Sequence, residues 1–127
     1  MRTEITASLR VSKWLGHNKE VAKYVAGLPV SFWQKGDPVQ GSLISRKDDG
    51  WKLDSTLSKE SSLAEHADRI LECVDPVLGS VHGIKIRLSF AVYVHGMDRP
   101  PLRLTAGAIR KLAALGAEVD IDLYNLP

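Results

Sequence analysis

The sequence contains a single cysteine, Cys73, which excludes an internal disulfide and any zinc site built from several thiolates. Long apolar runs are also missing, since no stretch approaches the ~18 apolar residues of a membrane-spanning helix. The first residues, "MRTEITASLRVSKW", lack the unbroken apolar segment of a secretion signal. These absences predict a protein of the reducing cytoplasm that does not bind a membrane.

An excess of charge of one sign is missing as well. Seventeen Lys and Arg oppose fifteen Asp and Glu and alternate with them along the chain, so nucleic acid is not expected as a partner. No G-x-S-x-G motif, phosphate-binding loop or dinucleotide fingerprint occurs, which favours a non-catalytic protein without a cofactor. With 127 residues, 44% of them hydrophobic, the chain fits one globular domain over residues 1–127.

The apolar residues repeat with the period of strands in some segments and of helices in others. Strands are expected at 5–11, 30–33, 84–94 and 117–124, and helices at 18–28, 61–74 and 105–116. The stretch 41–55 reads as a hairpin with Asp48, Asp49 and Gly50 at its tip. On the last strand, Val119, Ile121 and Leu123 are expected to face inward.

The predicted order is therefore β-α-β-β-α-β-α-β. Its first six elements match a ferredoxin-like split βαβ arrangement, which the last helix and strand extend. The fold class is α+β, a two-layer sandwich with helices on one face of a mixed, largely antiparallel sheet. Because the strands alternate apolar and polar residues, the other face of the sheet should be open to water or to a partner.

Two groups of acids are candidate sites. Asp48 and Asp49 do not fit a calcium loop, because Lys47 and Thr56 occupy ligand positions, so a solvated turn is favoured over a docking loop. Glu118, Asp120 and Asp122 form a ladder with neighbours roughly 7 Å apart on one face of the last strand. They could hold a metal or perform acid-base chemistry, but pairing with Lys85 and Arg87 on another strand is the favoured interpretation.

Histidine and cysteine positions do not predict a metal site. His66 and Cys73 are about 10 Å apart along one expected helix, too far to share an ion. His82 and His95 flank a strand at opposite ends. Cys73 lies beside an apolar stripe, which favours a partly buried, inert thiol.

Tryptophans suggest a protein-binding surface. Trp51 shares a strand face with Leu53 and should be buried, whereas Trp33 and Trp14 fall out of phase with their apolar neighbours and are expected to be exposed. Exposed tryptophan rimmed by cations is typical of binding hot spots. The candidates are Trp33, Trp14, Lys35, Arg87 and Tyr93. The opposing interpretation, that Trp33 and Trp14 merely cover sheet edges, has about equal weight.

The segments "GLPVSFWQKGDPV", "GWKLDS" and "LAALGAEVDIDLY" resemble, in this order, the bacterial family called domain of unknown function 4279 over nearly the whole chain. The resemblance implies a small, single-domain cytoplasmic bacterial protein and brings no catalytic residues. Its members resemble small proteins that act as immunity factors against toxins, which is an association rather than a property of any residue.

Two functions follow as hypotheses. The first is a protein-binding module, such as an immunity factor that sequesters a toxin, acting as a monomer or as a homodimer paired through a sheet edge. The alternative is a small-ligand-binding protein or an enzyme that uses the carboxylates of the last strand with His95 or Tyr93.

Overall fold

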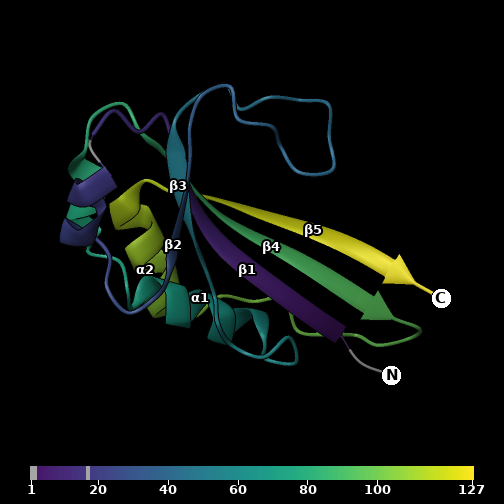
Figure 1. Ribbon diagram of the computed structural model, residues 1–127. Coiled ribbons are helices and arrows are strands. Elements are labelled where there is room, and N and C mark those ends of the chain that lie inside the picture. The colour runs from purple at the N-terminus through teal and green to yellow at the C-terminus, as the bar shows by residue number, and fades with distance from the viewer. Residues whose placement is uncertain (1–2, 17) are drawn as a thin grey trace.

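The computed structural model describes residues 3–16 and 18–127 and has two layers, with the helices against one face of a sheet (Figure 1). The described residues form five strands: β1 (Thr3–Ser12), β2 (Val30–Trp33), β3 (Gly50–Asp54), β4 (Lys85–His95) and β5 (Glu118–Leu126). They lie in the order β2-β3-β1-β4-β5. Neighbours are antiparallel except β4 and β5, which are parallel. The α+β class and the mixed sheet are therefore as predicted.

Both α-helices begin at the expected caps. In α1 (Leu63–Leu71), the Ser62 hydroxyl accepts a hydrogen bond from the Glu65 backbone, and the Glu65 carboxylate accepts one from the Ser62 N–H. In α2 (Ala106–Leu115), Thr105 caps the first turn and Gly116, at φ 63°, ends the last. The short 3-10 helix η2 (Pro76–Ser80) follows α1. Among the described residues, no helix is long and apolar enough to cross a membrane.

The prediction of a helix at 18–28 is wrong. The segment forms a single 3-10 helix, η1 (Asn18–Lys23). Beyond it the backbone bonds to the chain after α1 instead of continuing the helix: Tyr24 O accepts from Asp75 N, and Ala26 N donates to Cys73 O. These tertiary hydrogen bonds satisfy the groups that another helical turn would have used.

The prediction of a hairpin at 41–55 is also wrong. Residues 34–49 form a loop, and Gly50 is the first residue of β3 rather than part of a turn. The Asp49 carboxylate accepts a hydrogen bond from Lys35 N at 2.7 Å, and its carbonyl accepts one from Trp14 N at 3.0 Å. Asp49 thus ties the loop to the ends of β2 and β1, while β3 pairs with those two strands.

The core lies between the sheet and the helices. The inward residues of β1, β3 and β4, among them Leu9, Trp51 and Phe90, are completely or almost completely buried. The inward residues of β5 are not: Val119, Ile121 and Leu123 are 41%, 40% and 51% exposed, contrary to expectation. The helical layer is centred away from this strand, since α1 packs on β1, and α2 packs on α1 and η2.

His66 is buried inside this layer and predicts a pH-dependent stability. Its Nδ1 lies 2.7 Å from the Ser55 hydroxyl, and its Nε2 has no hydrogen-bond partner among the described residues. Burial lowers the pKa of His66 below its ordinary value, although the nearby Glu65 opposes the shift. Because the unfolded chain takes up the proton first, the free energy of unfolding should decrease as the pH falls below ~6.5, by at most about 1.4 kcal/mol per pH unit.

Urea unfolding at a series of pH values measures this decrease. Removing the titrating group with His66→Gln should flatten that part of the profile, whereas replacing the exposed His82 by Gln should leave it unchanged. An identical pH profile for His66→Gln and the wild type would show that His66 does not contribute.

Candidate functional site

The face of the sheet opposite α1 and α2 carries the polar residues of every strand. Strand register aligns them in rows, and one row contains three cations: Lys52 of β3 lies opposite Arg10 of β1, which lies opposite Arg87 of β4. Like charges directly opposite on neighbouring strands repel and destabilise a sheet. A row of three cations is therefore a local conflict of the kind that proteins tolerate at functional sites.

Two cations of this row, Arg10 and Arg87, line a pocket of about 200 Å³, which we call the basic pocket. The loop 34–49 extends on the side of the sheet away from the helices (Figure 1). Its Arg46 lines this pocket. The lining residues are Arg10, Ser12, Trp33, Arg46, Lys85 and Arg87. Four of these six side chains are cationic.

Trp33 is held against the sheet by the absence of a side chain at Gly50. The two residues are paired across β2 and β3, and a Cβ built on Gly50 would lie 2.3 Å from the Trp33 ring and 2.4 Å from the Val11 carbonyl oxygen. Arg46 lies over the Trp33 ring, with its Cζ 4.5 Å from the ring centroid. This cation–π contact and the close approach to Gly50 fix the aromatic wall of the pocket.

Arg46 itself is positioned by its backbone. Its N–H donates to the Asp37 carbonyl at 2.7 Å, and its carbonyl accepts from Gly36 N at 2.8 Å. The guanidinium therefore projects from a loop segment that is hydrogen-bonded on both sides.

Two carboxylates offset part of the positive charge of the row and the pocket. Asp54 lies 3.4 Å from Lys52 Nζ. Glu118 of β5 lies 3.1 Å from Arg87 Nη2 and 3.8 Å from Lys85 Nζ, which confirms the predicted pairing of these cations with the last strand. Arg10 donates only to the Ser8 hydroxyl, at 3.3 Å, and has no ion-pair partner among the described residues. The pocket thus keeps an excess of positive charge that an anionic group could neutralise.

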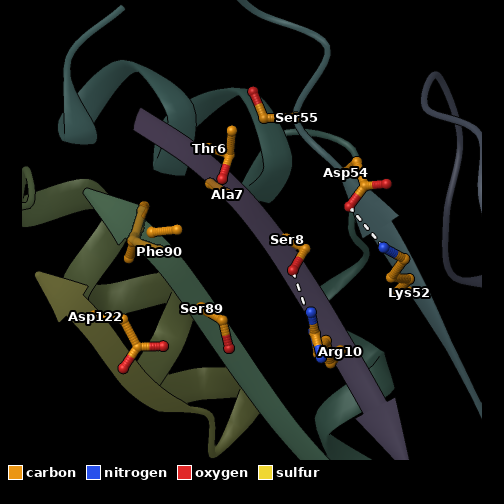
Figure 2. A pocket seen from close by; sticks show the side chains of 11 residues that line it. Thr6, Ala7, Ser8, Arg10, Lys52, Asp54, Ser55, Ser89, Phe90 and Asp122 are labelled. Carbon is orange, nitrogen blue, oxygen red and sulfur yellow. Dashed lines mark hydrogen bonds and ion pairs between the residues drawn. The ribbon is translucent and has the colours of Figure 1, made fainter. Parts of the chain in front are cut away.

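A second, larger depression lies beside the basic pocket, with a volume of about 390 Å³ (Figure 2). We call it the central hollow. Small side chains leave the space: Ser8 of β1 lies opposite Ser89 of β4, and Thr6 lies opposite Ala91. Figure 2 shows Lys52, Asp54, Arg10 and Asp122 around these residues.

Asp120 and Asp122 differ from Glu118 in the residues that lie opposite them on β4. They lie opposite Ser89 and Ala91, and within the described part of the chain neither forms an ion pair. The predicted pairing is therefore wrong for these two acids, because the cations of β4 lie only at the Glu118 end.

The far end of the open face is aromatic. Tyr93 stacks on Tyr124, with ring centroids 5.0 Å apart and planes inclined by 14°. His95 Nε2 lies 3.4 Å from the Glu4 carboxylate, so His95 pairs with β1 and not with the acids of β5. Over residues 3–16 and 18–127, no three His, Cys, Asp or Glu side chains are grouped to hold a metal ion.

The expected exposure of Trp14 is wrong. Its side chain is only 3% exposed and makes edge-to-face contacts with Trp51, at 5.8 Å, and Tyr24, at 6.1 Å. Lys13, at φ 59°, interrupts the strand alternation between Ser12 and Trp14. This left-handed residue turns Trp14 into the core, so that Trp14 belongs to no binding surface.

The remaining sequence candidates have separate places. Trp33 and Arg87 meet in the basic pocket, whereas Tyr93 lies at the opposite end of the same face. Lys35 and Asp49 are joined through a backbone hydrogen bond in the loop, and neither lines the pocket. Asp48 is half-buried in that loop, not at a hairpin tip.

Sequence reasoning missed Arg10 and Arg46 altogether and treated Lys85 only as an ion-pair partner. Arg10 and Lys85 occupy polar positions of long alternating strands, which was a visible signal of the open face. Nothing local marks Arg46, because only the course of the loop places it beside Trp33.

Comparison with known proteins gives one match. The family model described as Domain of unknown function (DUF4279) matches residues 3–126. No curated protein and no solved structure matches the chain.

Proposed function

This chain belongs to the DUF4279 family, and we propose that it is a non-catalytic protein-binding module whose basic pocket receives an acidic segment of its partner. The family description supplies no activity, so the proposal depends on the surface of the protein.

The observation that carries the proposal is the row Lys52–Arg10–Arg87 together with Trp33 and Arg46. Lys52 and Arg87 pair with Asp54 and Glu118, whereas Arg10 between them has no ion-pair partner among the described residues, so an anion bound at Arg10 would relieve the remaining repulsion. Trp33 adds an apolar wall, and tryptophan and arginine are the residues enriched in binding hot spots. A carboxylate-bearing peptide segment satisfies both features.

The proposal extends to the partner and the setting. We place the protein in the bacterial cytoplasm and name a toxin as the partner, which would make the chain an immunity factor. The support is the likeness of the family to small immunity proteins and not any residue of the site. The basic pocket lies on the open face of the sheet, so binding is possible for a monomer or for a homodimer paired through a sheet edge.

For the fold, we propose a variant of the ferredoxin-like split βαβ arrangement. Its support is the order β2-β3-β1-β4 with antiparallel neighbours. In this variant η1 occupies the position of the first helix, and α2 with β5 forms the extension.

Charge reversal in the row tests the binding function. A tagged protein is used to capture its partner from the native cell lysate, and the affinity for the purified partner is then measured by calorimetry. Arg10→Glu should weaken binding by about 30-fold or more, as loss of a hot-spot residue does. Trp33→Ala should weaken binding similarly without unfolding the chain.

A matched control is Arg110→Glu, which makes the same charge change at an exposed position of α2. It should bind like the wild type. Equal capture by the wild type, Arg10→Glu and Trp33→Ala, or the absence of any partner, would refute the proposed site.

The central hollow supports a second candidate, a small-ligand-binding protein or an enzyme that uses carboxylates of β5. Asp122 lines the hollow together with the hydroxyls of Thr6, Ser8 and Ser89. A thermal-shift screen against a metabolite library tests it: a ligand that stabilises the wild type but not Asp122→Asn would favour this candidate over the protein-binding module.

A further inference from the structure

β5 forms one edge of the sheet and has an open outer side (Figure 1). All of its residues, Glu118–Leu126, are exposed. An edge strand of this length presents a row of backbone donors and acceptors, and natural proteins normally protect such edges with charged side chains, above all lysine, with proline or with a bulge. The charged residues of β5 are the acids Glu118, Asp120 and Asp122, which alternate with its apolar residues. The strand "EVDIDLYNL" contains neither lysine nor proline.

The opposite edge is different. β2 has only four residues, is preceded by Pro29 and continues into the loop 34–49. Short length and an adjacent proline are common ways to protect an edge. β5 is therefore the edge that is open to pairing.

The helix side of β5 is also apolar without being covered. Val119, Ile121 and Leu123 are 40–51% exposed, while their neighbours on β4, Leu88, Phe90 and Val92, are at most 1% exposed. Covering this row would remove apolar surface from water, which favours association.

The outward backbone groups belong to the same apolar residues. Leu126 O accepts from Gly96 N, so Leu126 points its backbone groups toward β4. Because backbone direction alternates along a strand, the N–H and C=O groups of Ile121, Leu123 and Asn125 point outward. These residues can make backbone hydrogen bonds to an added strand without disturbing the pairing with β4.

We propose that the occupant of this edge is a second copy of the chain, paired through antiparallel β5 strands with Leu123 opposite Leu123 of the other copy. A twofold axis perpendicular to the sheet keeps both helical layers on the same side, so only residues of one face can lie opposite each other. The sheet then continues across both copies. This inference selects the homodimer from the two states that the proposed function leaves open, names the strand that pairs, and does not depend on the basic pocket.

The acids of β5 select the register. With Leu123 at the centre, Asp122 lies opposite Tyr124 and Asp120 opposite Leu126 of the other copy, so no two acids are paired. Centring on Asp122 would place that residue opposite itself, and centring on Ile121 would place Asp120 opposite Asp122. Like charges directly opposite are destabilising, so the Leu123 register is favoured. It also brings the two Leu123 side chains together within the apolar row.

Analytical ultracentrifugation of the purified full chain over a concentration series tests the dimer. The wild type should sediment as a dimer that dissociates on dilution. Leu123→Pro should be monomeric and folded, because the N–H that it removes points away from β4 and an edge strand tolerates proline there. Phe32→Lys, a change at a similarly exposed apolar residue on the β2 edge, should leave the dimer intact.

Cross-linking tests the register. Residues in a hydrogen-bonded antiparallel pair have Cα atoms about 5.5 Å apart, a distance that a disulfide spans. In a Cys73→Ser background, Leu123→Cys should form covalent dimers on oxidation in high yield. Asp122→Cys should not, since its counterpart lies two positions along the strand.

Three results would overturn the inference. A wild type that is monomeric at every concentration removes the dimer, and a dimer that survives Leu123→Pro lies elsewhere on the protein. Preferential cross-linking through Asp122→Cys disproves the register. Because Arg10→Glu leaves β5 unchanged, loss of partner binding in that variant is separable from loss of the dimer.

Discussion

Replacing Trp51 with alanine is expected to lower the free energy of unfolding by about 3–5 kcal/mol, the range for a large aromatic residue removed from a core. Trp51 is completely buried on β3, an interior strand of the sheet, between Val11 of β1 and Phe32 of β2. It also contacts the Trp14 ring edge to face at 5.8 Å, so its removal leaves a cavity and breaks an aromatic pair.

Urea unfolding followed by circular dichroism measures this loss. Small domains have only about 5–15 kcal/mol of stability in total, so Trp51→Ala should be close to unfolding at room temperature. Trp51→Phe should lose much less, because it keeps a ring and removes an indole N–H that has no hydrogen-bond partner among the described residues. The half-buried Trp33 is the comparison: if Trp33→Ala destabilised the protein as much as Trp51→Ala, the assignment of Trp51 to the core and Trp33 to the surface would be wrong.

Gly50→Ala is expected both to lower the free energy of unfolding and to distort the basic pocket. The new Cβ would approach the Val11 carbonyl oxygen to 2.4 Å and the Trp33 ring to 2.3 Å, distances that require the strand and the ring to move. Overpacking of this kind costs about 1–3 kcal/mol. Since Trp33 forms the wall of the basic pocket, the displaced ring should also lose its contact with Arg46.

Two readouts separate these effects. Urea unfolding gives the loss of stability, and quenching of tryptophan fluorescence by iodide reports on Trp33, because Trp14 and Trp51 are buried and Trp33 is surrounded by cations. Gly50→Ala should change the iodide quenching, whereas Gly107→Ala should not. A Cβ at Gly107 meets only the Thr105 hydroxyl at 3.9 Å, and alanine within α2 should be neutral or stabilising. Unchanged quenching in Gly50→Ala would show that Gly50 does not position Trp33.

The basic pocket and the β5 edge lie on different parts of the same sheet. If both proposals hold, the dimer carries two basic pockets, one from each copy, on one continuous open face. A partner with two acidic segments could bind both pockets at once. The effective concentration of the second segment would then raise the overall affinity without new contacts.

Much of the fold could be predicted from local sequence patterns. The alternation in β1 and β4, the Ser62–Glu65 capping box and the Gly116 helix end depend on residues a few positions apart, and each is present as predicted. Family membership could likewise be inferred from short motifs, and it is confirmed over residues 3–126.

The predictions of secondary structure and burial are wrong where long-range contacts compete with local preference. The segment after Lys23 leaves its helix to bond to residues 73–75, and Gly50 joins a strand although an Asp-Gly pair favours a turn. Trp14 enters the core because a single left-handed residue, Lys13, reverses the phase of the chain. None of these outcomes follows from periodicity, because each depends on which distant segment offers a partner.

Local sequence patterns are sufficient for the α+β class, the polar face of each strand, the N-terminal caps of both α-helices and the end of α2, because these depend on side-chain period and capping; α1 ends at Leu71, three residues before the predicted Val74. Only the tertiary structure decided that Lys52, Arg10 and Arg87 form one row, that Arg46 reaches Trp33, and that β5 lies uncovered at an edge. The physical reason is that strand order and register are set by packing between segments far apart in the chain, which no local pattern encodes.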